Sequence, residues 1–106
     1  GLYGYGTGTA AYNATTQNYI YMDKLAGNTS TSNVFGALVI DVLDYTNTSK
    51  YKTVRDLGGW DNNGSGEMHL DSGLWLNTNA ITTVNLVTLS GSNFSQYSHF
   101  ALYGVK

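Results

Sequence analysis

Residues 34–45 read Val-Phe-Gly-Ala-Leu-Val-Ile-Asp-Val-Leu-Asp-Tyr, a run typical of a core strand. Apolar side chains fall on both alternating faces: Val34, Leu38, Ile40 and Val42 on one, and Phe35, Ala37, Val39 and Leu43 on the other. A helix is the competing interpretation, but the β-branched residues and the Thr-Asn-Thr-Ser turn at 46–49 favour a strand. Apolar character on both faces predicts that this strand is buried and central in its sheet.

Further strands are expected on both sides of this run, at 17–25, 50–57, 67–71 continuing into 74–76, 80–89 and 100–105. In the second of these, Lys52 and Arg55 are expected to point outward, and Gly58 and Gly59 to end it. Residues 61–66 predict a hairpin turn, since Asn-Gly is the favoured pair for such turns. The next strand alternates, which predicts that Met68 and Leu70 face inward and that Glu67, His69 and Asp71 face outward.

The spacing of these strands, roughly every 10–15 residues with turns of Gly, Asn and Ser between them, is typical of an all-β fold. We expect an antiparallel β-sandwich of the jelly-roll kind. Residues 1–16 form a lead-in rich in Gly, Thr and Tyr, and residues 17–106 form the single β-sandwich domain. The last strand closes the fold: Phe100 and Leu102 are expected to face the core, with Lys106 at a sheet margin.

Composition excludes several classes of protein. There is no Cys, so neither a disulfide framework nor a thiolate metal site is expected. Charged residues make up 11% of the chain and the net charge is -2, which argues against nucleic-acid binding because phosphate contacts need clustered Lys and Arg. No apolar run approaches the ~20 residues of a membrane helix, so no membrane insertion is expected.

Several runs resemble a family of uncharacterised bacteriophage structural proteins that is common among marine phages. The similar segments are 32–37, 40–45, 47–55, 63–66, 72–75, 80–82, 93–98 and the ending Phe-Ala-Leu-Tyr-Gly-Val-Lys at 100–106. The resemblance covers about residues 17–106 and implies a virion component without catalytic residues. Family members carry a further β-rich N-terminal portion, which implies that this chain is the C-terminal part of a longer one.

The hairpin region holds two candidate sites. Trp60, Asp61 and Asn62 combine a flat aromatic ring with polar groups, an arrangement that suits stacking on a sugar and binding its hydroxyls; packing is the competing interpretation. Asp61, Asn63, Ser65 and Glu67 place oxygens at alternate positions around a turn, as calcium loops do. The EF-hand pattern fails at its twelfth position, which is Ser72, so a polar hairpin turn is the alternative. No other cofactor is expected.

Histidines occur at 69 and 99. His69 lies between Glu67 and Asp71 at two-residue spacing, which could hold a divalent metal; a solvated strand face is the more common explanation. Catalysis is not expected, because no Gly-x-Ser-x-Gly elbow occurs and Asp41 and Asp44 fall on opposite faces of one strand.

The sequence therefore predicts a non-enzymatic structural protein of a phage virion, a capsid decoration or a head or tail fibre component, exposed on the extracellular virion surface. Its expected partners are other virion proteins and copies of itself, with a trimer favoured by analogy with phage fibres and decorations. The alternative is a carbohydrate-binding module that recognises host-surface glycans.

Overall fold

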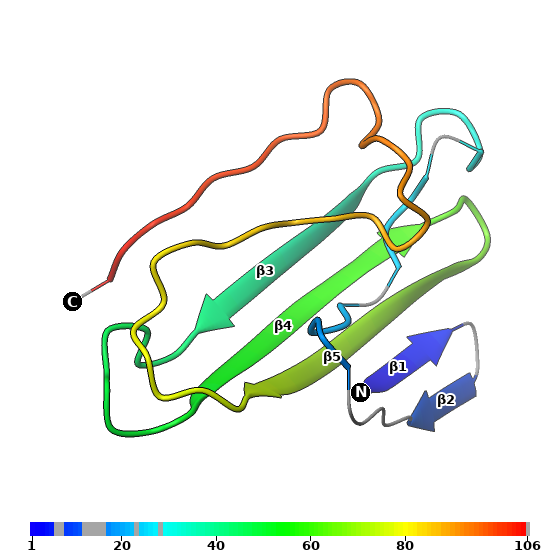
Figure 1. The fold of residues 1–106 in the computed structure, drawn as a ribbon. Coiled ribbons are helices and arrows are strands. Elements are labelled where there is room, and N and C mark those ends of the chain that lie inside the picture. Colours follow the sequence, from blue (N-terminus) through cyan, green and yellow to red (C-terminus); the bar gives the residue numbers. More distant parts are fainter. Residues whose placement is uncertain (6–7, 12–16, 23, 28, 106) are drawn as a thin grey trace.

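A computed structural model describes residues 1–5, 8–11, 17–22, 24–27 and 29–105. Within these ranges the regular structure is five β-strands: β1 Leu2–Tyr5, β2 Gly8–Ala11, β3 Gly36–Val42, β4 Lys52–Asp61 and β5 Gly66–Trp75. They form one antiparallel sheet in the order β2-β1-β5-β4-β3 (Figure 1). The expected all-β antiparallel fold is confirmed. The described residues include no helix, and hence none that could cross a membrane.

The β4–β5 hairpin is the longest element pair and its turn is as expected. Asn63 and Gly64 both have positive φ, 54° and 110°, the conformation for which an Asn-Gly pair is favoured. The amide of Asn62 donates to the carbonyl oxygen of Ser65 at 2.8 Å and closes the turn. The ladder then runs from Asp61 opposite Gly66 to Lys52 opposite Trp75, so the turn fixes which residues face each other along both strands.

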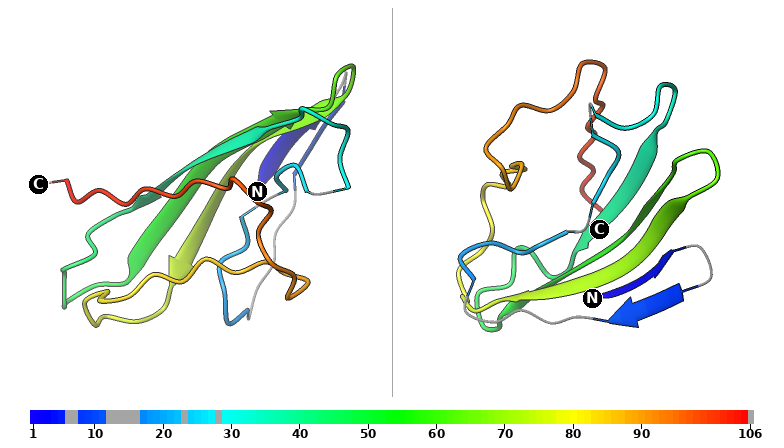
Figure 2. Two further views of the ribbon diagram at one scale, coloured as in Figure 1. Left: turned by 90° about the horizontal axis from the view of Figure 1, so that it is seen from above. Right: turned by 90° about the vertical axis from the view of Figure 1, so that its right-hand side faces the viewer.

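One face of the sheet is covered and the other is open. Figure 2 shows the irregular segments before β3 and after β5 lying on the same side of the sheet. Ile20 packs there so closely that a Cβ at Gly73 would lie 2.5 Å from its Cγ2 atom. The amide of Ile81 donates to the carbonyl oxygen of Tyr45 at 2.8 Å, which ties the segment after β5 to the end of the sheet.

The strand β3 lies at an edge of the sheet, so the prediction of a buried central strand is wrong. It pairs with β4 alone among the described strands. Leu38, Ile40 and Val42 are half-buried on the covered face, whereas Val39 is 65% exposed. The apolar residues on the second face of β3 are therefore not covered by any part of the described chain.

The expected orientation of residues 67–71 is reversed. His69 and Asp71 are 2% and 4% exposed, and Met68 and Leu70 are 62% and 51% exposed. Alternation is present as predicted, but the covering segments lie on the side to which the polar residues point. The pattern of a strand gives its two faces and cannot by itself say which of them the rest of the chain will cover.

Strand β4 differs from its prediction at both ends. Lys52 was expected to point outward and is fully buried, whereas Arg55 is exposed. The strand also continues through Gly58 and Gly59, which were expected to end it. These glycines leave room for β5: a Cβ at Gly58 would lie 2.6 Å from Nε2 of His69, and one at Gly59 would lie 2.7 Å from the carbonyl oxygen of Glu67.

Three expected strands are absent from the described structure. The described residues of 17–25, together with 80–89 and 100–105, are irregular. Phe100 and Leu102 are 58% and 86% exposed, so they do not face the core. A strand needs a neighbour for its backbone hydrogen bonds, which an alternating side-chain pattern does not supply. Conversely, the lead-in contains β1 and β2, and β1 pairs with β5. Lys106 lies outside the described residues.

Candidate functional site

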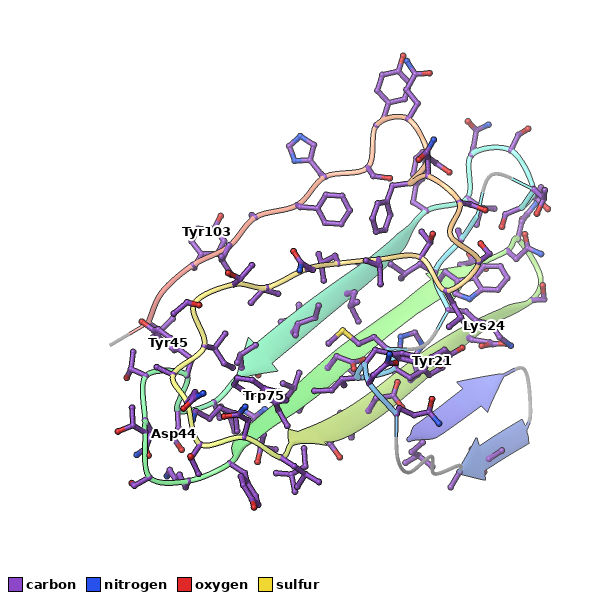
Figure 3. The ribbon with its side chains drawn as sticks, viewed as in Figure 1. Tyr21, Lys24, Asp44, Tyr45, Trp75 and Tyr103 are labelled. Atoms are coloured by element: carbon purple, nitrogen blue, oxygen red, sulfur yellow. The ribbon has the colours of Figure 1, made fainter. Side chains whose placement is uncertain are left out.

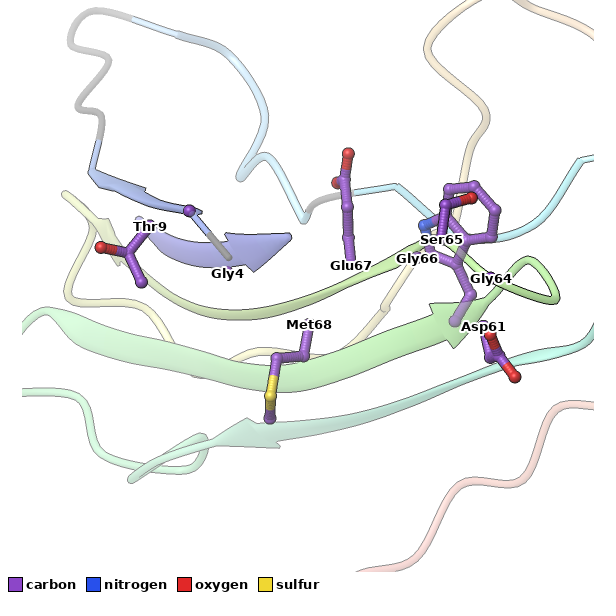
Figure 4. Close-up of a pocket in the computed structure, with 10 residues that line it drawn as sticks. Gly4, Thr9, Asp61, Gly64, Ser65, Gly66, Glu67 and Met68 are labelled. Carbon is purple, nitrogen blue, oxygen red and sulfur yellow. The ribbon is translucent and has the colours of Figure 1, made fainter. Parts of the chain in front are cut away.

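An open depression lies beside the hairpin end of the sheet (Figure 4). Residues from β1, β2, β4, β5 and the hairpin turn line it: Gly4, Gly8, Thr9, Trp60, Asp61, Gly64, Ser65, Gly66, Glu67 and Met68. Of the predicted sugar-binding set, it therefore includes Trp60 and Asp61 but not Asn62. Trp60 is half-buried, and its Nε1 is buried without a hydrogen bond to any described group. The indole thus offers part of its surface, with a donor facing inward.

The predicted calcium ligands do not gather at one point. Asp61 pairs with Gly66 and Trp60 pairs with Glu67, so Asp61 and Glu67 occupy adjacent rungs of the ladder. Side chains on adjacent rungs point to opposite faces, and Figure 4 shows the two carboxylates directed apart. Asp61 Oδ1 accepts from the amide of Asn63 at 3.0 Å, and Glu67 Oε1 lies 3.6 Å from Lys24 Nζ. Calcium binding at this hairpin stays a prediction.

A second polar group lies beneath the covering segments. Asp56 on β4 and His69 and Asp71 on β5 are all buried, and one ligand atom from each lies within 4.8 Å of the other two. His69 and Asp71 were noted from the sequence, but Asp56 was missed. Counting outward from the Asn63-Gly64 turn would have found it, since that register sets Asp56 opposite Asp71.

Lys52 is a further buried polar residue, with a structural role. Its Nζ donates to the carbonyl oxygens of Lys50 at 3.0 Å and Thr78 at 2.8 Å. It also lies 5.9 Å from the ring centroid of Trp75, within the range of a cation–π contact. Figure 3 labels Trp75 near the end of β5. Because Thr78 follows β5, this ammonium fastens the covering segment to the start of β4.

The open face carries a row of apolar side chains across four strands. Val39, Leu57, Leu70 and Leu2 are neighbours in the registers of β3, β4, β5 and β1, and all are more than half exposed. Met68 and Leu74 extend this row along β5, and these six residues are called the open face below. An ion pair, Arg55 Nε to Asp41 Oδ2 at 3.0 Å, borders it. Contiguous exposed apolar surface of this kind marks an interaction site.

Comparison with protein-family models, curated proteins and solved structures found no match for this chain.

Proposed function

We propose that this chain is a non-enzymatic structural protein of a bacteriophage particle, a capsid decoration or a component of a head or tail fibre. The sequence resemblance to phage structural proteins favours it, and the open face is the observation that carries it. Such a protein works by burying surface against its neighbours in the particle. Its place would be the extracellular surface of the virion, among other virion proteins.

The accessible surface of the chain supports burial in an assembly. It amounts to 8547 Å², whereas a compact monomer of 11.5 kDa is expected to expose about 5,800 Å². The radius of gyration is 15.1 Å, against about 13 Å for a compact domain of this length. The excess is about 2,700 Å² per chain, enough to supply an obligate interface, which buries about 2,000–5,000 Å² over both partners.

A second copy of this chain is the proposed occupant of the open face. Packing of this face against the sheets of neighbouring copies around a three-fold axis would place further sheet on it, as the β-sandwich expected from the sequence requires. Apolar side chains would then be buried on both sides of β3, as its sequence pattern requires. By analogy with phage fibres and decorations, the copies are proposed to associate as trimers.

Purified particles of the phage that encodes this chain provide the test. Mass spectrometry should detect the protein in the particles, and electron microscopy should place its copies on capsid three-fold axes or along a fibre. Its absence from purified particles would refute the proposal.

A carbohydrate-binding function is the second candidate, favoured by the depression that Trp60 and Asp61 line together with the hydroxyls of Thr9 and Ser65. A glycan array should then show binding by the wild type and loss of it in Trp60→Ala. Tyr97→Ala is the matched control, because Tyr97 is 88% exposed and lies outside the depression. Failure of the wild type to bind any glycan would remove this candidate.

A further inference from the structure

The covered face contains two acidic side chains that face each other directly. Asp56 and Asp71 are opposite in the β4–β5 register and are 2% and 4% exposed. Like charges in directly opposite positions destabilise a sheet, and burial strengthens their repulsion because the surroundings screen it poorly. A cation placed between these carboxylates would convert this repulsion into a link between the two strands.

His69 adds a nitrogen ligand to the same place. It lies two residues before Asp71 on the same face of β5, opposite Gly58, and the missing side chain of Gly58 makes room for its imidazole. The ring is 2% exposed, and neither Nδ1 nor Nε2 has a hydrogen-bond partner among the described residues. Buried polar atoms in native proteins are nearly always partnered, so a bare buried imidazole beside two carboxylates calls for an explanation.

We propose that Asp56, His69 and Asp71 bind one divalent transition-metal ion of the Zn²⁺ type. Imidazole favours Zn²⁺ and its neighbours over Ca²⁺ and Mg²⁺, and carboxylate oxygens complete mixed nitrogen and oxygen sites. The three ligand atoms lie within 4.8 Å of one another, so small side-chain rotations bring each to the ~2.0–2.2 Å of a zinc bond. Two carboxylates and a neutral imidazole balance the ion's charge.

Two charged groups near the cluster are compatible with a bound metal. The amino group of Gly1 lies 3.8 Å from Oδ1 of Asp71, and a carboxylate can hold an ammonium and a metal on different oxygens. The ammonium of Lys52, four rungs away along the β4–β5 ladder, is held by the carbonyls of Lys50 and Thr78. Because the ligands come from β4 and β5 beneath the covering segments, the ion would bind as the chain folds and would stabilise the folded state.

The test is to refold the full chain with and without ZnCl₂, dialyse it, and measure bound zinc by elemental mass spectrometry alongside the thermal unfolding midpoint. We expect one zinc per chain and a raised midpoint in the wild type. Asp56→Asn and His69→Gln should each weaken zinc binding by at least about 100-fold, because the loss of a contact that only supports a ligand already costs roughly 10–100-fold. The matched control is Asp41→Asn, which changes an exposed carboxylate on the neighbouring strand β3, outside the cluster, and should leave zinc binding unchanged.

The wild type itself carries an internal control, which holds even if a variant fails to fold. NMR spectra of the two imidazoles should show zinc shifting the ring nitrogens of buried His69 while leaving exposed His99 unchanged. Absence of zinc from the folded wild type, zinc binding retained in folded His69→Gln, or a shift confined to His99 would each overturn the proposal. None of these results would bear on whether the open face assembles.

Discussion

Replacing Leu57 and Leu70 together by Ser should weaken assembly of the chain by an amount that the structure predicts. The two side chains are opposite in the β4–β5 register and are 54% and 51% exposed. Complete burial of a Leu side chain contributes about 1.5–3 kcal/mol, so burying the exposed half of each contributes about 1 kcal/mol. The double substitution should thus cost about 2 kcal/mol per chain, or about 4 kcal/mol for a contact between two copies, which corresponds to roughly 1,000-fold weaker association.

Sedimentation equilibrium measures this change, with circular dichroism to verify that the variant keeps its sheet. Leu89→Ser is the matched control: Leu89 is 69% exposed, lies in a turn outside the five strands, and should leave the association constant unchanged. An association constant equal to that of the wild type in a folded Leu57→Ser, Leu70→Ser protein would show that the open face is not the interface.

Three further predictions concern the isolated fold. Lys52→Met should lower the free energy of unfolding by about 1–3 kcal/mol in urea titrations, because two part-buried hydrogen bonds from a charged donor are lost. Exposed Lys50→Met should change it by at most about 1 kcal/mol, and equal effects would contradict the role given to Lys52. Gly66→Ala should lower the free energy of unfolding by about 1–3 kcal/mol, since Gly66 has φ 149° and an added Cβ would collide with the carbonyl oxygen of Trp60. Gly27→Ala is the control: no atom lies within 4 Å of the added Cβ, so the same titration should show almost no change. Deleting residues 100–106 should keep a cooperative thermal transition and cost about 1 kcal/mol, the value of the Phe94–Phe100 ring contact. Loss of the transition would mean that this segment, whose described residues 100–105 are exposed, holds the fold together.

The parts of the fold that follow from local chemistry could be predicted from the sequence. The Asn63-Gly64 turn favours positive φ at both positions, and the hairpin and its register follow from that. Strand β3 was found from its β-branched, apolar run. The candidate metal cluster could also be derived from this register, because the register sets Asp56 opposite Asp71.

The burial of each sheet face depends on which other segments cover it, and local sequence patterns do not encode this. Met68 and Leu70 alternate with His69 and Asp71 as predicted, yet the apolar pair lies on the open face. Burial inferred from apolar character alone assumes that the cover comes from the same chain. Where a second copy covers the apolar face, as proposed here, the same pattern leaves that face exposed in the single chain. Segments such as 100–105 likewise have the sequence pattern of a strand but no strand partner within the described chain.

Oxidation of the two methionines by dilute hydrogen peroxide, followed by mass spectrometry, tests most directly whether the open face is buried in an assembly. Met68 is 62% exposed on that face, and Met22 is half-buried in the covering segment before β3. In the dissociated Leu57→Ser, Leu70→Ser variant, Met68 should form sulfoxide faster than Met22, because exposure governs the reaction. In the concentrated wild type the order should reverse, as a second copy shields Met68. Equally fast oxidation of Met68 in both proteins would contradict the account.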